Sequence, residues 1–195
     1  MMKSIKDKDG CLRNVGKYNA YKYAFGMIKE AIESGFYFQA ITIEESILCD
    51  RLLSVLLIGK DVLRKDKLSN ATLGSALREW HDGRNTPLAV IDKLNALLGE
   101  YTDFCSACSA RRFDLKTCKP SSGSTPRERL YVWWRYRCAL LHGIVTSTRG
   151  EGPKFSPVEV DEIAKRVAEI GLGNVRKVDS VCPLNHRLSK IRQYA

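Results

Sequence analysis

The sequence predicts an all-α protein, a helical bundle that forms one domain over residues 1–195. Apolar residues recur at the three- and four-residue spacing of a helix face through most of the chain. Two segments, 125–128 and 156–159, combine a capping box with proline at the first helical position, which is typical of helix starts. No two segments show the alternating pattern of paired strands. A chain of this length can also bury a full core.

The individual helices follow from this spacing and from the residues that interrupt it. After a flexible lead over residues 1–16, the predicted helices cover 17–32, 37–57, 70–80, 88–98, 125–142 and 156–170. Ser34 and Gly35 separate the first two helices, because glycine is a poor helix former. Thr86 and Pro87 start the fourth, with threonine as the cap and proline in the first turn.

Two further segments lack the helical pattern. Residues 101–124 contain three cysteines without regular apolar spacing, so we expect a loop or small appendage before the helix at 125. Residues 171–195 are predicted as a basic tail, in which 188–194 fit a short helix.

Composition narrows the setting in which the protein works. The formal net charge of +10 favours polyanionic partners such as RNA or DNA. No apolar run approaches the length of a membrane span, and the first residues lack the apolar stretch of a signal peptide. Seven cysteines, an odd number, indicate a reducing compartment. We therefore expect a cytoplasmic protein with no membrane partner.

An arginine lies in the middle of an apolar helix face. On a helix, Arg137 projects in the same direction as Leu130, Trp133, Trp134, Leu140 and Leu141. A guanidinium cannot lose its charge, so its burial is costly unless the group is paired. The position therefore predicts a buried ion pair, a site for an anionic ligand, or both. The candidate carboxylates are Glu44, Glu45 and Asp50, of which we expect Glu45 or Asp50 to support the arginine.

A histidine follows on the same helix. His142 comes five positions after Arg137, and Gly143 suggests that the helix ends there. The spacing Arg-x4-His, followed by Gly143 late in an all-helical chain, resembles the HEPN superfamily of nucleotide-binding and ribonuclease domains. Many members have Asn, Asp or His directly after the arginine, where this chain has Cys138. Some have a tyrosine two positions after the histidine, where this chain has Ile144.

The resemblance covers most of the chain as architecture and implies a function. It implies a metal-independent endoribonuclease in which Arg137 and His142 are catalytic and no cofactor is needed. Members of this kind are toxins or anti-phage effectors that cleave tRNA or another RNA, so an antitoxin or other regulatory partner is also expected.

The residue types suit this chemistry. RNA carries its own nucleophile, the 2′-hydroxyl beside the scissile phosphate. Histidine titrates near neutrality and can act as base or acid, while arginine offers a planar fork that matches phosphate oxygens. One arginine–histidine pair is not enough to cleave RNA, because its two side chains point in different directions from the helix. A homodimer would bring two pairs to one cleft, and Val132, Arg135, Tyr136, Ala139 and His142 form a second face that a partner could cover.

Other interpretations remain open. Arg135 is either a contact to RNA phosphate or a solvated arginine, and the second face could instead be buried within a monomer. The chain could be a HEPN-like module that binds RNA or nucleotides, or dimerises, without cleaving. Alternatively, Cys105, Cys108, Cys118 and Cys182 could bind zinc, since the first two have zinc-knuckle spacing.

Overall fold

The computed structural model describes residues 5–6, 12–13, 15–56, 72–83, 86–99, 125–144 and 156–181. Its helices in these ranges are α1 (Val15–Glu33), α2 (Tyr37–Leu56), α4 (Leu73–Asp82), α5 (Leu88–Leu98), α7 (Pro126–Ile144) and α8 (Pro157–Val181). The predicted all-α bundle is confirmed. One feature was not predicted: β1 (Ile5–Lys6) and β2 (Leu12–Arg13) form a short antiparallel pair. Strands of this length are too short to show an alternating pattern.

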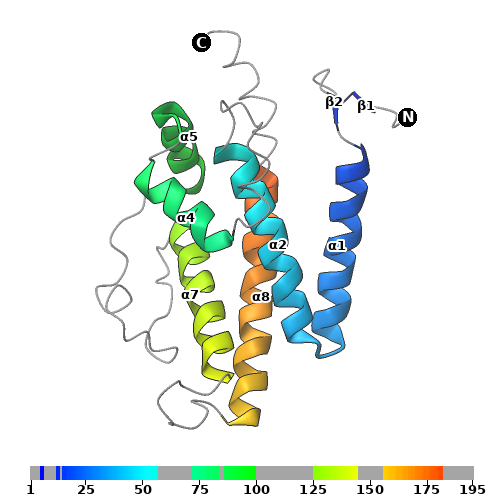
Figure 1. Cartoon of the computed structure of the whole chain (residues 1–195). Helices are drawn as coiled ribbons and strands as arrows, with labels where there is room; N and C mark the ends of the chain where they lie inside the picture. The colour runs from blue at the N-terminus through cyan, green and yellow to red at the C-terminus, as the bar shows by residue number, and fades with distance from the viewer. Residues whose placement is uncertain are drawn as a thin grey trace.

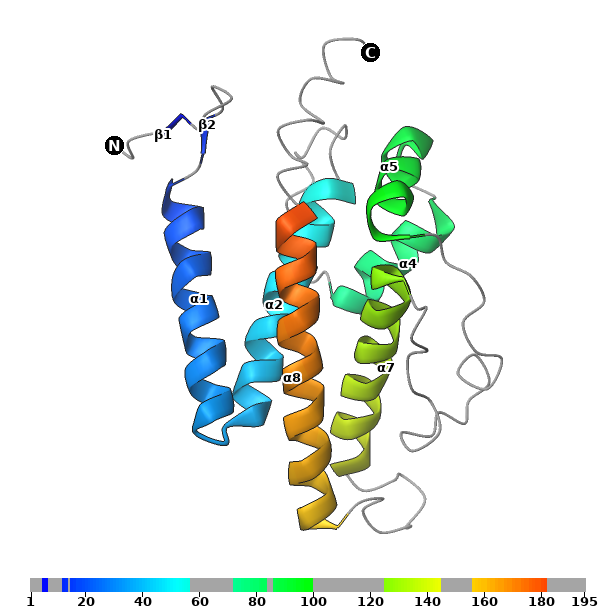
Figure 2. The same ribbon diagram turned by 180° about the vertical axis from the view of Figure 1, so that it is seen from behind.

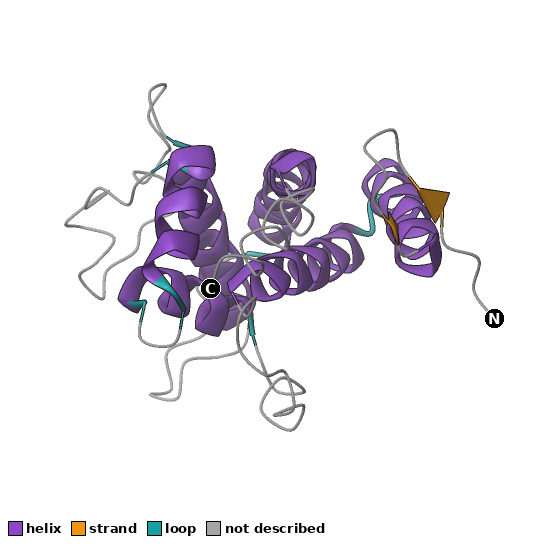
Figure 3. Ribbon diagram, turned by 90° about the horizontal axis from the view of Figure 1, so that it is seen from above, coloured by secondary structure: helices purple, strands orange, loops and turns teal. Residues whose placement is uncertain are grey.

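Four long helices lie side by side, and the two short ones lie at one end of α7 (Figure 1). Helix α2 packs on α1, α4 and α8, while α7 packs chiefly on α8. Viewed along the bundle, α1 lies at the edge farthest from α4 and α5 (Figure 3). Helices α2 and α8 run in the same direction, and α7 runs against both (Figure 2). This arrangement places α2, α7 and α8 around a common centre.

The two predicted capping boxes start α7 and α8. At α7, the Thr125 hydroxyl accepts a hydrogen bond from the Glu128 amide, and the Glu128 carboxylate accepts one from the Thr125 amide. Ser156 and Glu159 make the same reciprocal bonds at α8. Each box satisfies backbone amides that a helix start leaves without a partner. Two of the helices that border the candidate site therefore have starts fixed by local sequence.

The predicted cap at Thr86 was wrong. Helix α5 has Pro87 at its cap position, without a side-chain capping bond. The Thr86 hydroxyl is buried and instead bonds to the Leu56 carbonyl at 3.1 Å and to the Glu79 carboxylate at 2.9 Å. A threonine hydroxyl can form a hydrogen bond either with its own helix start or with residues distant in sequence. Here the hydroxyl is buried between helices, so it bonds to the distant residues.

The predicted start of the tail at Gly171 was also wrong. Helix α8 continues through Gly171 and Gly173 to Val181, with Val175 and Val178 buried. Glycine lowers intrinsic helix propensity by about 1 kcal/mol, which packing against neighbouring helices can offset. The remaining residues of the predicted tail lie outside the described ranges.

Aliphatic and aromatic side chains from all six helices form one core. Trp80, Trp133, Leu48, Leu52, Leu130 and Leu140 are among its fully buried members. Trp133 and Leu140 belong to the apolar face of α7 on which the sequence places Arg137. The arginine therefore lies beside the core.

Candidate functional site at the junction of α2, α7 and α8

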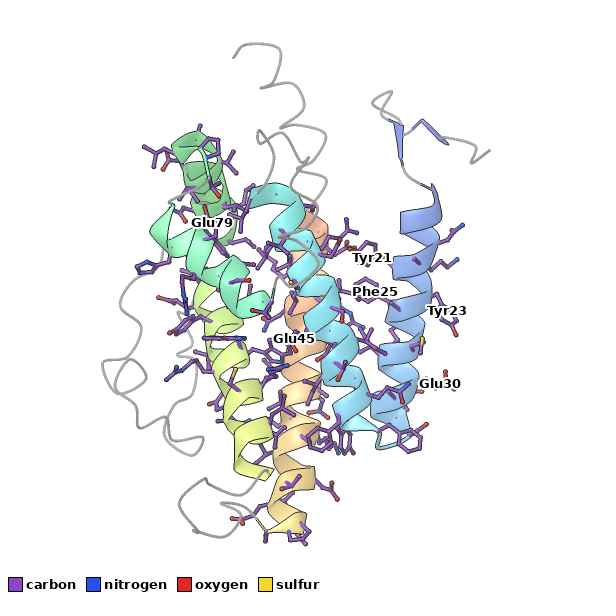
Figure 4. The ribbon with its side chains drawn as sticks, in the orientation of Figure 1. Tyr21, Tyr23, Phe25, Glu30, Glu45 and Glu79 are labelled. Carbon is purple, nitrogen blue, oxygen red and sulfur yellow. The ribbon has the colours of Figure 1, made fainter. Side chains whose placement is uncertain are left out.

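Arg137 of α7 forms an ion pair with Glu45 of α2. The Arg137 side chain is 26 % exposed and the Glu45 side chain 18 % exposed, so the pair lies near the surface. Glu45 is on the side of α2 that faces α7 (Figure 4). Such a pair is screened less than an exposed one and escapes the full desolvation cost of a buried one. The structure therefore joins Arg137 to one of the three carboxylates considered.

The rest of the guanidinium has few polar contacts. Its Nη1 lies 4.0 Å from the Cys138 sulfur, and its Nε is buried with no hydrogen-bond partner among the described residues. Burial raises the pKa of the Cys138 thiol, and the bond and charge from Arg137 offset part of this effect. Cys138 is therefore a neutral neighbour of the guanidinium.

Glu44, the residue before Glu45, is the most unusual side chain of the site. It is 0 % exposed, and neither carboxylate oxygen has a hydrogen-bond partner within the described part of the chain. Burial raises its pKa to about 9, because the charged form is poorly solvated inside the core. At neutral pH this side chain is therefore an uncharged acid beside an ion-paired carboxylate.

Position 171 of α8 requires glycine, because the Glu44 carboxyl lies directly against the backbone there. A Cβ on Gly171 would lie 2.6 Å from Glu44 Cδ and 2.7 Å from Trp133 Nε1, and would overlap both. The Trp133 indole donates a hydrogen bond of 2.8 Å to the Val167 carbonyl, one turn earlier on α8. Glu44, Trp133 and Gly171 thus meet where α2, α7 and α8 converge.

Sequence reasoning did not identify this role of Glu44. Its signal was present, because Ala40, Ile41, Ile47 and Leu48 are buried at the three- and four-residue spacings around it. A carboxylate at the centre of that stripe is the same anomaly that marked Arg137. Because Glu44 and Glu45 are adjacent, both were considered only as carboxylates that could pair with Arg137.

Asp50 does not support Arg137. It accepts a hydrogen bond from the Tyr21 hydroxyl of α1, on the opposite side of α2 (Figure 4). Helix geometry separates the two candidates, because residues 45 and 50 differ by about 140° around a helix. The neighbouring Arg51 stacks over the Tyr21 ring at 3.9 Å and pairs with Asp179 of α8 at 2.5 Å. These contacts tie α1, α2 and α8 together.

The other predicted site residues are placed only in part. Arg135 is half-buried on α7, and its charge opposes the rise that burial causes in the pKa of Cys138. The backbone of His142 lies in the last turns of α7, which extends to Ile144, and its side chain lies outside what the structure describes. Cys105, Cys108, Cys118 and Cys182 also lie outside the described residues. Within the ranges described, no group of three or more His, Cys, Asp or Glu side chains could hold a metal ion.

The second face of α7 is covered in part by the chain itself. Val132 and Tyr136 are buried. Tyr136 lines a small hollow against α8, together with Ile163, Arg166, Val167 and Ile170. Packing on α8 thus accounts for part of the apolar character of this face.

Among the helices that the structure describes, none combines the length and apolar content needed to cross a membrane. Comparison of the chain with protein-family models, curated proteins and solved structures found no match.

Proposed function

We propose that this protein is a metal-independent endoribonuclease in which Arg137 and His142 act on the scissile phosphate. The observation that most supports the proposal is the Arg137–Glu45 ion pair on a helix that also contains His142. The pair orients a permanent positive charge that is about one quarter exposed, so an anionic ligand could reach it. A structural arginine of the core would need no such access.

Each residue has a defined role in the proposed reaction. His142 takes the proton of the 2′-hydroxyl or gives one to the leaving 5′-oxygen. Arg137 donates hydrogen bonds to the phosphate oxygens, where negative charge develops as the phosphorane forms. Glu45 holds the guanidinium plane, so it is a positioning residue. Because one histidine cannot fill both proton roles at once, the proposal includes a homodimer that contributes a second pair.

The proposed substrate is RNA, with tRNA as one candidate. The net charge of +10 favours such a polyanion. The resemblance to HEPN domains suggests a toxin or anti-phage effector of the cytoplasm, controlled by an antitoxin or another regulatory partner.

Cleavage of labelled RNA in EDTA tests the proposal. Wild type should cut without metal, and Arg137→Ala and His142→Ala should each lower the rate by about 10²- to 10⁴-fold. Arg51→Ala is the matched control, because it removes a second interhelical arginine pair, with Asp179, outside the motif. The control should cut at nearly the wild-type rate. Equal loss in all three variants, or cutting only with added metal, would contradict the proposal.

A non-catalytic module is the second candidate, and one observation favours it. Cys138 contributes no strong polar group beside Arg137. A HEPN-like bundle of this kind would bind RNA or nucleotides, or dimerise, without cleaving. Binding of labelled RNA that is weakened by Arg137→Ala, with no cutting in any buffer, would favour the module over the nuclease.

A further inference from the structure

The Glu44 carboxyl has no role in the proposed cleavage, although no side chain of the described helices is more enclosed. It faces Gly171 of α8 so closely that even a methyl group would not fit. The indole of Trp133 covers it from α7, with its N–H committed to the Val167 carbonyl. A carboxyl without hydrogen bonds in such a site is tolerated only while it is neutral, because an isolated buried charge is very costly.

Among the described residues, no hydrogen-bond donor reaches either oxygen of the Glu44 carboxyl. On α2 the adjacent carboxylate, Glu45, is bound to Arg137 of α7. On α8, Asp179 is bound to Arg51, and Asn174 near Gly171 is neutral.

Helices α1 and α4 also pack on α2, but their charged residues do not face Glu44. Lys29 and Glu30 of α1 and Arg78 of α4 are exposed to solvent. Glu79 of α4 is bonded to Thr86. In the packing observed, therefore, ionised Glu44 would lack a cation to stabilise it.

We propose that Glu44 is a proton-controlled switch in helix packing: α8 stays closed against α2 and α7 only while the Glu44 carboxyl holds its proton. When the proton leaves, the carboxylate must reach water. The carboxyl lies against Gly171 on α8, so water reaches it when α8 moves away from α2 around Gly171. The switch is independent of the proposed nuclease activity, because it needs neither Arg137 nor His142.

The proposed mechanism determines how the opening constant of α8 depends on pH. In the open state Glu44 returns towards its ordinary pKa of 4.5, whereas in the closed state burial raises the pKa to about 9. Between these values each opening event releases one proton. The opening constant of α8 should therefore rise about tenfold for each pH unit, or about 100-fold from pH 6 to pH 8.

Amide hydrogen exchange of the full chain at pH 6, 7 and 8 measures this constant, after correction for the intrinsic pH dependence of exchange. In wild type, protection of the α8 amides around Gly171 should fall about tenfold per pH unit. In Glu44→Gln it should not change with pH. Glu45→Gln is the matched control, since it removes the adjacent carboxylate, and it should keep the wild-type dependence.

Three outcomes would overturn the switch. Protection at α8 could be independent of pH in wild type, or depend on pH equally in Glu44→Gln. Protection of the α4 and α5 amides could also equal that of the α8 amides at each pH, which would mean global unfolding in place of a local opening. If Glu44→Gln does not fold, Glu44→Met serves as an apolar replacement of similar length. The carbon-13 shift of the wild-type Glu44 carboxyl gives an independent measure, and titration near pH 4.5 would also exclude the switch.

Discussion

Arg137 and Glu45 join α7 to α2 through one ion pair, while Glu44, the next residue on α2, remains uncharged within the core. Two adjacent glutamates therefore have opposite electrostatic states. The difference arises from helix geometry, because a rotation of about 100° turns one side chain to a cation near the surface and the other to Gly171 and Trp133.

The Arg137–Glu45 pair should contribute measurably to stability. Both side chains are less than one third exposed, so removal of either partner leaves a poorly solvated charge. A double-mutant cycle of Arg137→Ala and Glu45→Ala, measured by urea denaturation, should give a coupling free energy of about 1–2 kcal/mol. A cycle of Arg51→Ala and Asp179→Ala provides the comparison, since Asp179 is 35 % exposed and its coupling should be smaller. Additive effects of the Arg137 and Glu45 substitutions would show that the contact is energetically neutral.

The free energy of unfolding should fall as pH rises above about 5, and Glu44 should be the cause. Its pKa is raised on folding, so the folded state holds a proton that the unfolded chain has released. The stabilising contribution is complete below pH 4.5 and is lost progressively until the pH passes about 9. The slope should approach about 1.4 kcal/mol per pH unit in wild type and should be absent in Glu44→Gln. Chemical denaturation at several pH values measures both, and a variant with the wild-type slope would implicate other groups.

Gly171→Ala should destabilise the protein by about 2–4 kcal/mol, although alanine is the better helix former. The new methyl group would overlap the Glu44 carboxyl and the Trp133 indole. Gly173→Ala is a matched control two positions later, because nothing lies within 4 Å of a Cβ there. It should stabilise α8 by about 0.5–1 kcal/mol. Glu44→Ala combined with Gly171→Ala should recover part of the loss in thermal denaturation, and a failure to do so would place the overlap elsewhere.

Asn95→Ala should cost about 1–3 kcal/mol, because two donors that share its side-chain oxygen would lose their acceptor. That oxygen accepts bonds from Trp80 Nε1 at 3.0 Å and from Arg127 Nη1 at 2.6 Å, and the arginine also stacks over the Trp80 ring. Asn95→Asp keeps the shared acceptor oxygen and adds a charge that attracts Arg127, so it should retain most of the stability. Urea denaturation compares the two variants. Equal losses would mean that the hydrogen bonds from Trp80 and Arg127 contribute little.

The sequence predicts those features that local chemistry determines. The starts of α7 and α8 follow from two capping boxes whose partners are three residues apart. The anomaly at Arg137 is also visible locally, because an apolar stripe has a fixed spacing on one helix.

Features that depend on several helices were not predictable in the same way. In the sequence, Gly171 suggests the end of a helix. In the structure, it leaves space for the Glu44 side chain of α2, a helix distant in sequence. The bonds of Thr86 to Leu56 and Glu79 depend on where three elements meet. The Tyr21 partner of Asp50 depends on how α1 packs against α2.

The parallel packing of α2 against α8 has a consequence for how the chain folds. These helices lie far apart in sequence, so their contact closes a long loop and we expect it to form late. Until α8 arrives, Glu44 is open to water and ionised at neutral pH. Completion of the core must then coincide with the uptake of a proton from solvent, so the last folding step should slow as the medium becomes more alkaline.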